Sequence, residues 1–342
     1  MSYRIAINGM GRIGRSVLRA YYEGEHASDL SIVALNELAD IKTLAHLLRY
    51  DSTHGRFPGR VDIDGASLLI NGDRLAVTHI EELGRLPWAQ QKVDLVMECT
   101  GTFTARARAQ IHLERGADKV LFSQPAEHDV DATIVYGVNH GELRPGHTII
   151  SNASCTTNCI VPVIHCLDQA LGINSGVITT IHSAMNDQPV LDAYHHTDLR
   201  KTRSAFQSII PVETGLARGI ERILPALEGR FEAQAMRVPT VNVSVIDLSV
   251  VVEKAVSAAE VNQLIRAAAE KGLPNVLAFT DEPLASCDFN HDPRSAIVDL
   301  SQTRVSGHHL VKVLAWFDNE WAYANRMLDV ARLLKRFGKV KV

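Results

Sequence analysis

The sequence predicts an α/β protein of two domains, an N-terminal doubly wound parallel sheet and an α+β domain with a mixed or antiparallel sheet. Short buried strands alternate with helices through the first 150 residues. After them come one long helix and strands in which polar and apolar residues alternate. With 342 residues, the chain also exceeds the size of one ordinary core.

The N-terminal elements begin with the apolar run Tyr3–Asn8, which predicts a buried parallel strand. Glycines follow at once, and Arg15–Tyr22 then has the apolar spacing of a helix. Ser31–Asn36 is a second buried strand, so these elements form a β-α-β unit with a right-handed crossover. Further short strands are predicted at Asp94–Cys99, Lys119–Phe122, Thr133–Tyr136 and Thr148–Ile150.

The second domain is expected to open with a long helix over Cys155–Leu171. A final helix is predicted over Trp321–Phe337, with Arg and Lys late, as a helix C-terminus prefers. Between these helices, strand patterns occur at Val177–Ile181, Phe231–Val238, Val241–Val252 and Leu310–Trp316.

Composition narrows the classes of partner. The formal net charge is -4 without a long basic run, which argues against nucleic acid or an anionic membrane as a partner. No stretch of 18 apolar residues escapes a charge or a proline, and the start, MSYRIAING, lacks a signal-peptide core. The 5 cysteines follow no framework spacing, so we expect a reducing, cytoplasmic location.

A glycine motif, Gly9, Gly11 and Gly14, follows the first strand and opens the first helix. Gly9 permits a tight turn, Gly11 lets a pyrophosphate approach, and Gly14 lets helix and strand pack closely, as in Rossmann-type domains. Glu37 ends the second strand, where it could accept hydrogen bonds from ribose hydroxyls and repel a 2′-phosphate. This pattern predicts NAD rather than NADP; the alternative is a structural turn without a ligand.

Cys155 is the candidate nucleophile because it stands where a strand gives way to a helix. Unpaired N–H groups and the helix dipole are expected to lower the pKa of its thiol. Cys159 and Cys166 lie deeper in the same helix and read as buried apolar residues. Cys99 and Cys287 show no activating feature.

His182 is the best placed of the 15 histidines to serve as the base. It ends a strand, VITTIH, that follows the helix of the cysteine, so it could return to the same edge of a sheet. The alternative is a surface histidine at a strand end. No spacing indicates a zinc site, and we expect no metal.

The motifs INGMGRIGR, ECTG, SNASCTTNC, RVPT and WFDNEW, in this order, resemble the glyceraldehyde-3-phosphate dehydrogenase superfamily over nearly the whole chain. The resemblance implies a homotetramer that uses NAD on a sugar-phosphate aldehyde. It also implies a C-terminal helix that returns to the first domain, so that the NAD-binding domain spans 1–153 with 319–342 and the catalytic domain 154–318.

The resemblance also implies a role for each matching residue. Cys155 is then the nucleophile and His182 its activator. The cofactor residues are Gly9, Gly11, Arg12 and Ile13 (through their backbone), Gly14, Glu37, Thr100, Ser123, Asn319 (at the nicotinamide carboxamide) and Tyr323. The substrate residues are Ser154, Thr156, Thr214 and Gly215 around one anion site, with Asp187, Arg200 and Arg237, whose guanidinium forks suit a phosphate.

Two positions depart from the superfamily. Phosphorylating relatives carry a threonine three residues after the catalytic histidine, whereas Met185 stands here and has no hydroxyl to donate. A substrate one carbon longer than a triose phosphate is therefore plausible. Relatives often carry an arginine that flanks the cofactor where Glu81 and Glu82 stand, so NAD is expected to bind more weakly or be held differently.

The function implied is oxidation of the aldehyde through a thiohemiacetal and a thioester on Cys155. Either water or inorganic phosphate could release the thioester, and the two acceptors define two different enzymes. Semialdehyde dehydrogenases share the chemistry but would leave Arg200 and Arg237 idle. A non-catalytic NAD-binding regulator stays open as a hypothesis of another class.

Overall fold

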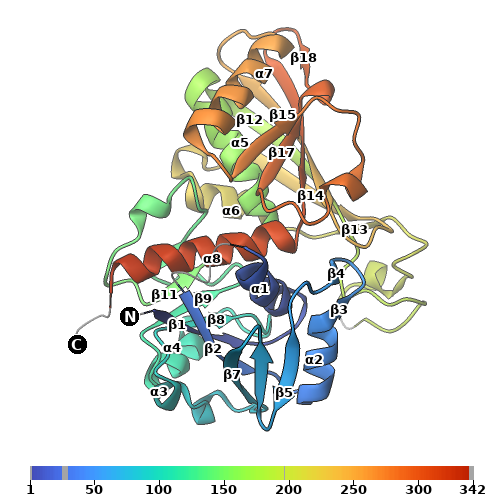
Figure 1. Cartoon of the computed structure of the whole chain (residues 1–342). Coiled ribbons are helices and arrows are strands. Elements are labelled where there is room, and N and C mark those ends of the chain that lie inside the picture. Colours follow the sequence, from blue (N-terminus) through green and yellow to red (C-terminus); the bar gives the residue numbers. More distant parts are fainter. Residues whose placement is uncertain (1, 25–29, 196, 339–342) are drawn as a thin grey trace. The chain divides into compact units, whose positions relative to one another are not determined.

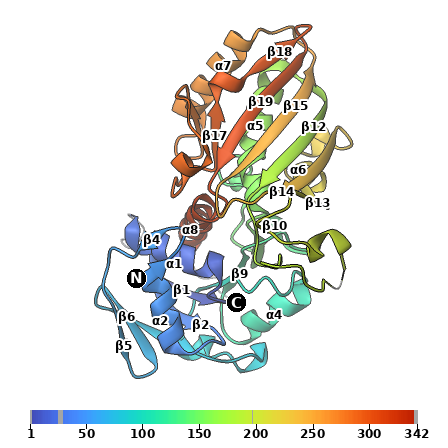
Figure 2. The ribbon, with the colours of Figure 1, turned by 90° about the vertical axis from the view of Figure 1, so that its right-hand side faces the viewer.

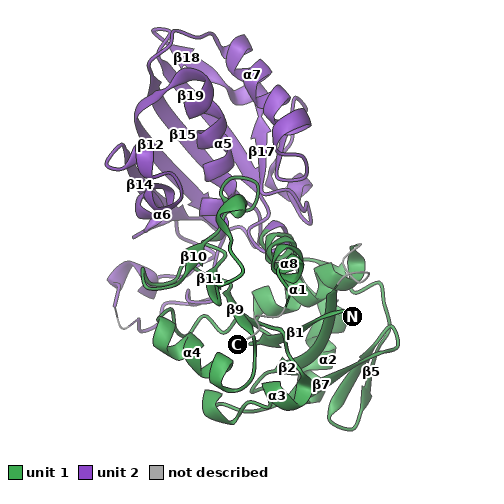
Figure 3. Cartoon of the chain, turned by 90° about the vertical axis from the view of Figure 1, so that its left-hand side faces the viewer, with its two compact units in different colours: residues 1–154, 323–342 green, residues 155–322 purple. Residues whose placement is uncertain are grey.

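The computed structural model describes residues 2–24, 30–195 and 197–338. The chain divides into two compact units (Figure 3), unit 1 with residues 1–154 and 323–342 and unit 2 with residues 155–322. The sequence placed these boundaries after residues 153 and 318.

Unit 1 contains a mostly parallel sheet of nine strands among its described residues (Figure 1). The strand order is β10-β11-β9-β8-β1-β2-β7-β6-β5, and the pairs from β10 to β7 are all parallel. Only β5 and β6 add an antiparallel edge. The bounds are β1 Tyr3–Asn8, β2 Leu30–Asn36, β5 Val61–Asp64, β6 Ser67–Ile70, β7 Asp73–Thr78, β8 Leu95–Glu98, β9 Lys119–Phe122, β10 Ala132–Thr133 and β11 Ile149–Ser151.

Five helices belong wholly or mainly to unit 1. They are α1 Arg12–Glu23, α2 Ile41–Arg49, α3 Trp88–Gln91, α4 Arg106–Glu114 and α8 Trp321–Arg336. A short hairpin of β3 (Tyr50–Asp51) and β4 (Gly55–Arg56) follows α2. All residues of β8 are buried, and so are all residues of β1 except Arg4, as expected for parallel strands covered on both faces.

The strand expected at Thr133–Tyr136 is wrong beyond its first residue, because β10 ends at Thr133. The Asn139 side chain takes over the backbone there: its Oδ1 accepts the Val135 N–H at 2.8 Å, and its Nδ2 donates to the Thr133 carbonyl at 2.9 Å. The Ile134 N–H still donates to the Ser151 carbonyl at 2.8 Å, but the Asn139 bonds then turn the backbone at Val135 away from β11.

Unit 2 contains a mixed sheet of eight strands among its described residues (Figure 2). The order is β13-β14-β12-β15-β19-β17-β16, with β18 also on β19, and most pairs are antiparallel. The bounds are β12 Ile173–His182, β13 Ile210–Val212, β14 Phe231–Arg237, β15 Ser244–Val252, β16 Leu277–Thr280, β17 Ala296–Asp299, β18 Arg304–Ser306 and β19 Leu310–Phe317.

The long helix α5 (Cys155–Leu171) packs on this sheet and on α6 (Leu216–Ile223) and α7 (Ala258–Ala267). The strand expected from Val241 begins only at Ser244, because Val243 has a φ of +65°, which extended backbone does not allow. The α/β class, with a Rossmann-like sheet in unit 1 and a mixed sheet in unit 2, is confirmed.

Candidate active site

The glycine motif in unit 1 occupies positions where a side chain does not fit. Gly9 has a φ of +91°, and a Cβ there would lie 2.7 Å from the Thr100 nitrogen. A Cβ on Gly14 would lie 2.0 Å from the Gly9 carbonyl oxygen, so β1 and α1 pack at backbone distance. Gly11 is the N-cap of α1, and nothing lies within 4 Å of a Cβ built on it. The open space at Gly11 is what a close-approaching phosphate needs.

A cavity of about 460 Å³ lies beside this motif, at the carboxyl ends of β1, β2 and β8. Its lining includes Asn8, Gly9, Gly11, Asn36, Glu37 and Thr100. Ligands of open α/β sheets bind at this edge. The cavity and the glycine backbone therefore fit a dinucleotide.

Glu37 clamps the glycine loop. Its carboxylate accepts the Met10 N–H at 2.7 Å and the N–H groups of Leu38 and Ala39 at 2.7 and 3.2 Å. Met10 stands between Gly9 and Gly11, so the acid at the end of β2 holds the loop in register. Oε1 accepts both Leu38 and Ala39, whereas Oε2 accepts only Met10 and keeps a second lone pair for a ligand hydroxyl.

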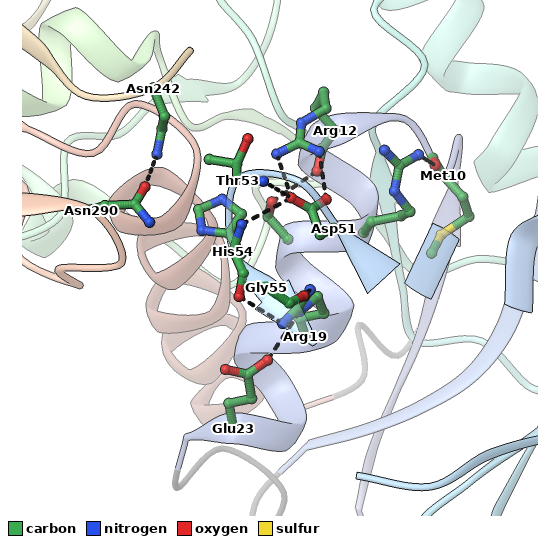
Figure 4. A network of polar contacts seen from close by, with 12 residues as sticks. Met10, Arg12, Arg19, Glu23, Asp51, Thr53, His54, Gly55, Asn242 and Asn290 are labelled. Atoms are coloured by element: carbon green, nitrogen blue, oxygen red, sulfur yellow. Dashed lines mark hydrogen bonds and ion pairs between the residues drawn. The ribbon is translucent and has the colours of Figure 1, made fainter. Parts of the chain in front are cut away.

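Arg12 and Ile13 open α1, and the Arg12 side chain turns to the β3–β4 hairpin (Figure 4). Both nitrogens of its guanidinium fork pair with the Asp51 carboxylate. Asp51 also accepts the N–H groups of Thr53 and His54 at 2.8 and 3.0 Å. Burial opposes the charge on Asp51, but these donors together hold its pKa well below the usual range.

The other residues expected to bind the cofactor lie on several elements, in unit 1 and in unit 2. Thr100 follows β8 and Ser123 follows β9, both at the carboxyl edge of the sheet. The buried hydroxyl of Tyr323 donates to the Ala153 carbonyl at 2.8 Å, where Ala153 has a φ of +54°. In unit 2, Oδ1 of Asn319 accepts the hydroxyls of Ser183 and Ser244, each at 3.0 Å. These bonds orient the amide and leave its Nδ2 as the donating end.

Cys155 and His182 meet in unit 2 although 27 positions separate them. Cys155 is the first residue of α5 and His182 the last of β12, and the Cys155 Sγ lies 3.8 Å from His182 Nε2. His182 Nδ1 lies 2.8 Å from the Ser183 carbonyl oxygen, which can only accept. Nδ1 therefore carries the ring hydrogen, and the lone pair of Nε2 faces the sulfur.

The expectation that the helix N-terminus lowers the thiol pKa is wrong for the free protein. Burial raises the pKa of Cys155 to about 11, and the nearby Glu320 and Asp318 add to the rise. The N–H groups of Thr156 and Cys155 act in the expected direction but are outweighed. Burial also lowers the pKa of His182, so the resting pair is a neutral thiol beside a neutral imidazole.

Geometry, rather than a raised pKa, sets Cys155 apart from the buried cysteines. Burial raises the pKa of Cys99 to about 12 and that of Cys166 to about 11. Cys166 donates to the Leu264 carbonyl, and Cys159 is fully buried. Cys287 is exposed. Of the described thiols, only Cys155 contacts an imidazole nitrogen.

Arg237 stands beside the base, because it pairs with His182 in the register of β12 and β14. Its guanidinium donates to Asp187 and, at 3.3 Å, to Gln188 Oε1. Burial opposes the charge on Asp187, but Arg237 and Lys201 hold the pKa of its carboxyl below the usual value. Asp187 therefore anchors the arginine in this structure.

Arg200 lies on the short turn η4 (Leu199–Thr202), which packs against β13. Its side chain is exposed and forms no ion pair with the described residues. β13 in turn pairs with the end of β14 that carries Arg237. Arg237 and Arg200 are thus on neighbouring elements. Asp187 holds the Arg237 side chain, whereas the Arg200 side chain has no ion-pair partner among the described residues.

The residues expected around the anion site lie at helix starts. Ser154 and Thr156 flank Cys155, while Thr214 and Gly215 precede α6, with Gly215 as its N-cap. A Cβ on Gly219 of α6 would lie 2.9 Å from Thr157 Oγ1, so the two helices pack closely there.

Met185 follows β12 on the loop that carries Asp187 and is 47% exposed. Its N–H donates to Gln188 Oε1 at 3.0 Å, the oxygen that also accepts from Arg237. The thioether thus stands on the loop that anchors the arginine.

Several residues of the cavity were not found from the sequence. Asn8 and Asn36 end β1 and β2, and their signal was a polar residue at the carboxyl end of a buried strand. Phe103 and Arg108 line the same cavity, with the Arg108 guanidinium 5.4 Å from the Phe103 ring centre. Arg108 is a cation in the cavity that Glu81 also lines.

Among the described residues, no group of three or more His, Cys, Asp or Glu side chains is arranged to bind a metal ion. None of the helices that the described residues form is long and apolar enough to cross a membrane.

Two family models match the chain. Residues 3–106 match the model described as glyceraldehyde 3-phosphate dehydrogenase, NAD binding domain. Residues 154–319 match the model described as glyceraldehyde 3-phosphate dehydrogenase, C-terminal domain. The first match contains the glycine motif and the cavity, and the second contains Cys155 and His182.

Proposed function

Because this chain belongs to the glyceraldehyde 3-phosphate dehydrogenase family, and is thus an NAD-dependent dehydrogenase of phosphorylated sugar aldehydes, we propose that its substrate is D-erythrose 4-phosphate. The product is 4-phospho-D-erythronate, in pyridoxal 5′-phosphate biosynthesis. Met185 carries this proposal, because an exposed thioether replaces a phosphate-binding hydroxyl on the loop that anchors Arg237. Within the superfamily, NELAD (36–40), HSAMNDQPVLDAYH (182–195) and DFNHDPRSAIVD (288–299) resemble D-erythrose-4-phosphate dehydrogenase.

The geometry of Cys155 and His182 supports nucleophilic catalysis. The sulfur adds to the aldehyde carbon while its proton passes to Nε2, which faces it at 3.8 Å. The carbonyl oxygen, stabilised by the Cys155 N–H and the His182 ring, takes that proton back from Nε2 and becomes the hydroxyl of a thiohemiacetal. Nε2 then takes the hydroxyl proton as hydride leaves, and a thioester remains. NAD, when bound, supplies the acceptor for that hydride.

Water is the proposed acyl acceptor. It adds to the thioester carbon, the acid leaves, and the sulfur recovers a proton. If inorganic phosphate added instead, the product would be an acyl phosphate and the enzyme a glycolytic glyceraldehyde-3-phosphate dehydrogenase. The loss of a hydroxyl at Met185 favours water, because that hydroxyl binds phosphate in the phosphorylating relatives.

The cofactor is NAD, and we propose how this chain holds it. The backbone of Gly9, Gly11, Arg12, Ile13 and Gly14 takes the pyrophosphate, and Glu37 takes the adenosine ribose while repelling a 2′-phosphate. Thr100 and Ser123 flank the nucleotide from the same sheet edge, and the free Nδ2 of Asn319 takes the nicotinamide carboxamide. Tyr323 acts through the Ala153 carbonyl that it holds.

For the substrate, Arg200 and Arg237 take the phosphate as two guanidinium forks. Asp187 keeps Arg237 in place. The second anion site consists of Ser154, Thr156, Thr214 and Gly215.

A homotetramer in the cytoplasm is the proposed state of the protein. Large apolar side chains gather at high exposure on one segment, namely Val190, Leu191, Tyr194, Leu199, Phe206 and Ile209. Contiguous exposed apolar surface of this kind supports association between protein chains. Light scattering on the purified protein tests it, and a monomeric mass would contradict it.

The test of the substrate is NADH formation with D-erythrose 4-phosphate and with glyceraldehyde 3-phosphate, each with and without inorganic phosphate. We expect fast oxidation of the four-carbon sugar that does not depend on phosphate. A faster, phosphate-dependent reaction with the triose would overturn the proposal and make Met185 a tolerated replacement. One carbon changes binding by about 1–3 kcal/mol, so some side activity is expected.

A further inference from the structure

A buried polar network beneath the nucleotide cavity has no part in the chemistry described above. It centres on Glu98, the last residue of β8, whose side chain is 0% exposed. His112 and Trp88 are also fully buried, and Asn8 is 1% exposed. Burying a charge costs several kcal/mol unless it is well hydrogen-bonded, so a buried polar network of this kind points to a functional role.

One branch reaches Glu98 from the helices. The Trp88 indole N–H, which can only donate, lies 2.9 Å from His112 Nδ1. Nδ1 must therefore accept, and the hydrogen of the neutral imidazole sits on Nε2. Nε2 then donates to Glu98 Oε2 at 3.0 Å. A charged His112 ring would carry a hydrogen on Nδ1 as well, and that hydrogen would face the indole N–H. The contact between His112 and Glu98 is therefore a hydrogen bond from a neutral ring rather than an ion pair.

A second branch reaches Glu98 across the strands. The Ile80 N–H, again a pure donor, lies 3.0 Å from Asn36 Oδ1 and so fixes the orientation of that amide. Asn36 Nδ2 donates to Asn8 Oδ1 at 2.8 Å, and Asn8 Nδ2 donates to Glu98 Oε2 at 2.7 Å. Every donor in this branch points towards the same carboxylate.

The other oxygen of Glu98 holds the segment after β8. Oε1 accepts the Thr100 N–H at 2.9 Å and the Thr100 hydroxyl. The Thr100 nitrogen is the atom that a Cβ on Gly9 would meet at 2.7 Å, so this backbone packs directly on the glycine loop. Glu98 therefore accepts four donors and offers none, which only an ionised carboxylate does.

We propose that Glu98 is a positioning residue for NAD: as the common acceptor of both branches, it holds Asn8, Asn36 and Thr100 in the geometry that the nucleotide cavity requires. All three line the cavity, whereas Glu98 does not. Glutamine cannot replace it, since its NH₂ group would face a donor on either side. Neither branch can reverse, because the Ile80 and Trp88 N–H groups fix their outer ends.

The test is the dissociation constant for NAD of Glu98→Gln, measured by titration calorimetry on the full chain without substrate. We expect it to rise at least about ten-fold. At saturating NAD, the KM for the sugar phosphate and the kcat stay within about two-fold of the parent values, because the Cys155 site is untouched. Glu114→Gln is the matched control: Glu114 is exposed at the end of α4, and its loss leaves the NAD affinity unchanged.

A second variant keeps the proposal testable if Glu98→Gln does not fold. Trp88→Phe removes the indole N–H that fixes the His112 ring and its tautomer, so the Nε2 hydrogen bond to Glu98 is no longer held in place. The NAD dissociation constant then rises about three- to ten-fold. Trp316→Phe is its control, since the Trp316 indole lies in unit 2 and its Nε1 has no hydrogen-bond partner among the described residues.

The competing explanation is a purely structural role. It predicts a lower melting temperature for Glu98→Gln with an NAD dissociation constant within two-fold of the parent, and that result overturns the proposal. An unchanged constant in Trp88→Phe, when Glu98→Gln does not fold, overturns it as well. These outcomes are independent of which sugar phosphate is the substrate.

Discussion

The two units treat a buried ionisable group in opposite ways. In unit 1, Glu98 accepts four hydrogen bonds, and the Ile80 and Trp88 N–H groups fix the outer ends of the two branches that reach it. In unit 2, the Cys155 thiol faces one base at 3.8 Å, and burial raises its pKa to about 11. A binding edge benefits from hydrogen-bond partners that stay in place, whereas a reaction centre needs a proton that can leave. The predictions below test each half of this contrast.

The largest effect is expected from Cys155→Ala. Removing the nucleophile eliminates the thioester route, so NADH formation falls at least about 10⁴-fold. The NAD dissociation constant stays near the parent value, because the cofactor edge belongs to the other unit. Cys166→Ala is the control: Cys166 donates to the Leu264 backbone carbonyl, away from His182, and the variant keeps full activity. Retention of more than about one per cent of activity by Cys155→Ala would remove Cys155 from the mechanism.

A smaller loss is expected from His182→Asn. Without Nε2 the thiol has no acceptor for its proton, and kcat falls about 10²–10⁴-fold. The loss shrinks as pH rises towards 11, because the thiolate then forms unaided. His165→Asn, half-buried on α5, is the control. A deficit that stays constant from pH 7 to 10 would contradict this and show that the proton on the thiohemiacetal hydroxyl, not the thiol proton, is the one whose removal by His182 limits the rate.

Alkylation of the free protein measures the thiol directly. With a pKa of about 11, the thiolate fraction of Cys155 rises about ten-fold per pH unit between pH 7 and 10. The rate of iodoacetamide modification at Cys155, followed by mass spectrometry, should rise in parallel. A free cysteine peptide, with a pKa near 8.5, levels off earlier and is the comparison. A plateau at Cys155 below pH 8 would mean that the resting pair is already ionised.

The pKa of the Cys155 thiol could be predicted from the sequence only in part. The position of Cys155 at the start of a helix was visible in the sequence, and so was the direction in which N–H groups act. The burial that outweighs them comes from packing, which no local pattern contains. The 3.8 Å contact with His182 likewise depends on the fold of β12 and α5.

Prediction of the strands from the sequence was limited in the same way. Lys119–Phe122 and Tyr3–Asn8 are found at their expected bounds, because continuous apolar runs need no partner to be recognised. Thr133–Tyr136 looked similar, but Asn139 holds its backbone in a turn. The antiparallel edge β5–β6 was not assigned at all, and neither was the network around Glu98, whose branches join residues up to 90 positions apart.

The smallest effect is expected from Asp51→Asn, which tests a second carboxylate of unit 1. Asp51 holds Arg12 at the start of α1, and its pKa is lowered despite burial (Figure 4). A lowered folded pKa adds stability above the unfolded value, near 3.9, which is lost as pH falls through the folded value. Asp51→Asn should therefore cost about 1–3 kcal/mol at pH 7, measured by denaturant unfolding, and less below pH 4.

The control for Asp51 is Asp64, whose ion pair with Arg74 is more than half exposed on both sides. Asp64→Asn is expected to change the free energy of unfolding by only about 0–1 kcal/mol, because water screens the pair. Equal costs for the two variants would mean that the buried donors around Asp51 add nothing beyond a surface ion pair. The contrast between the units would then rest on Glu98 and Glu37, the other carboxylates near the cofactor motif that accept several donors.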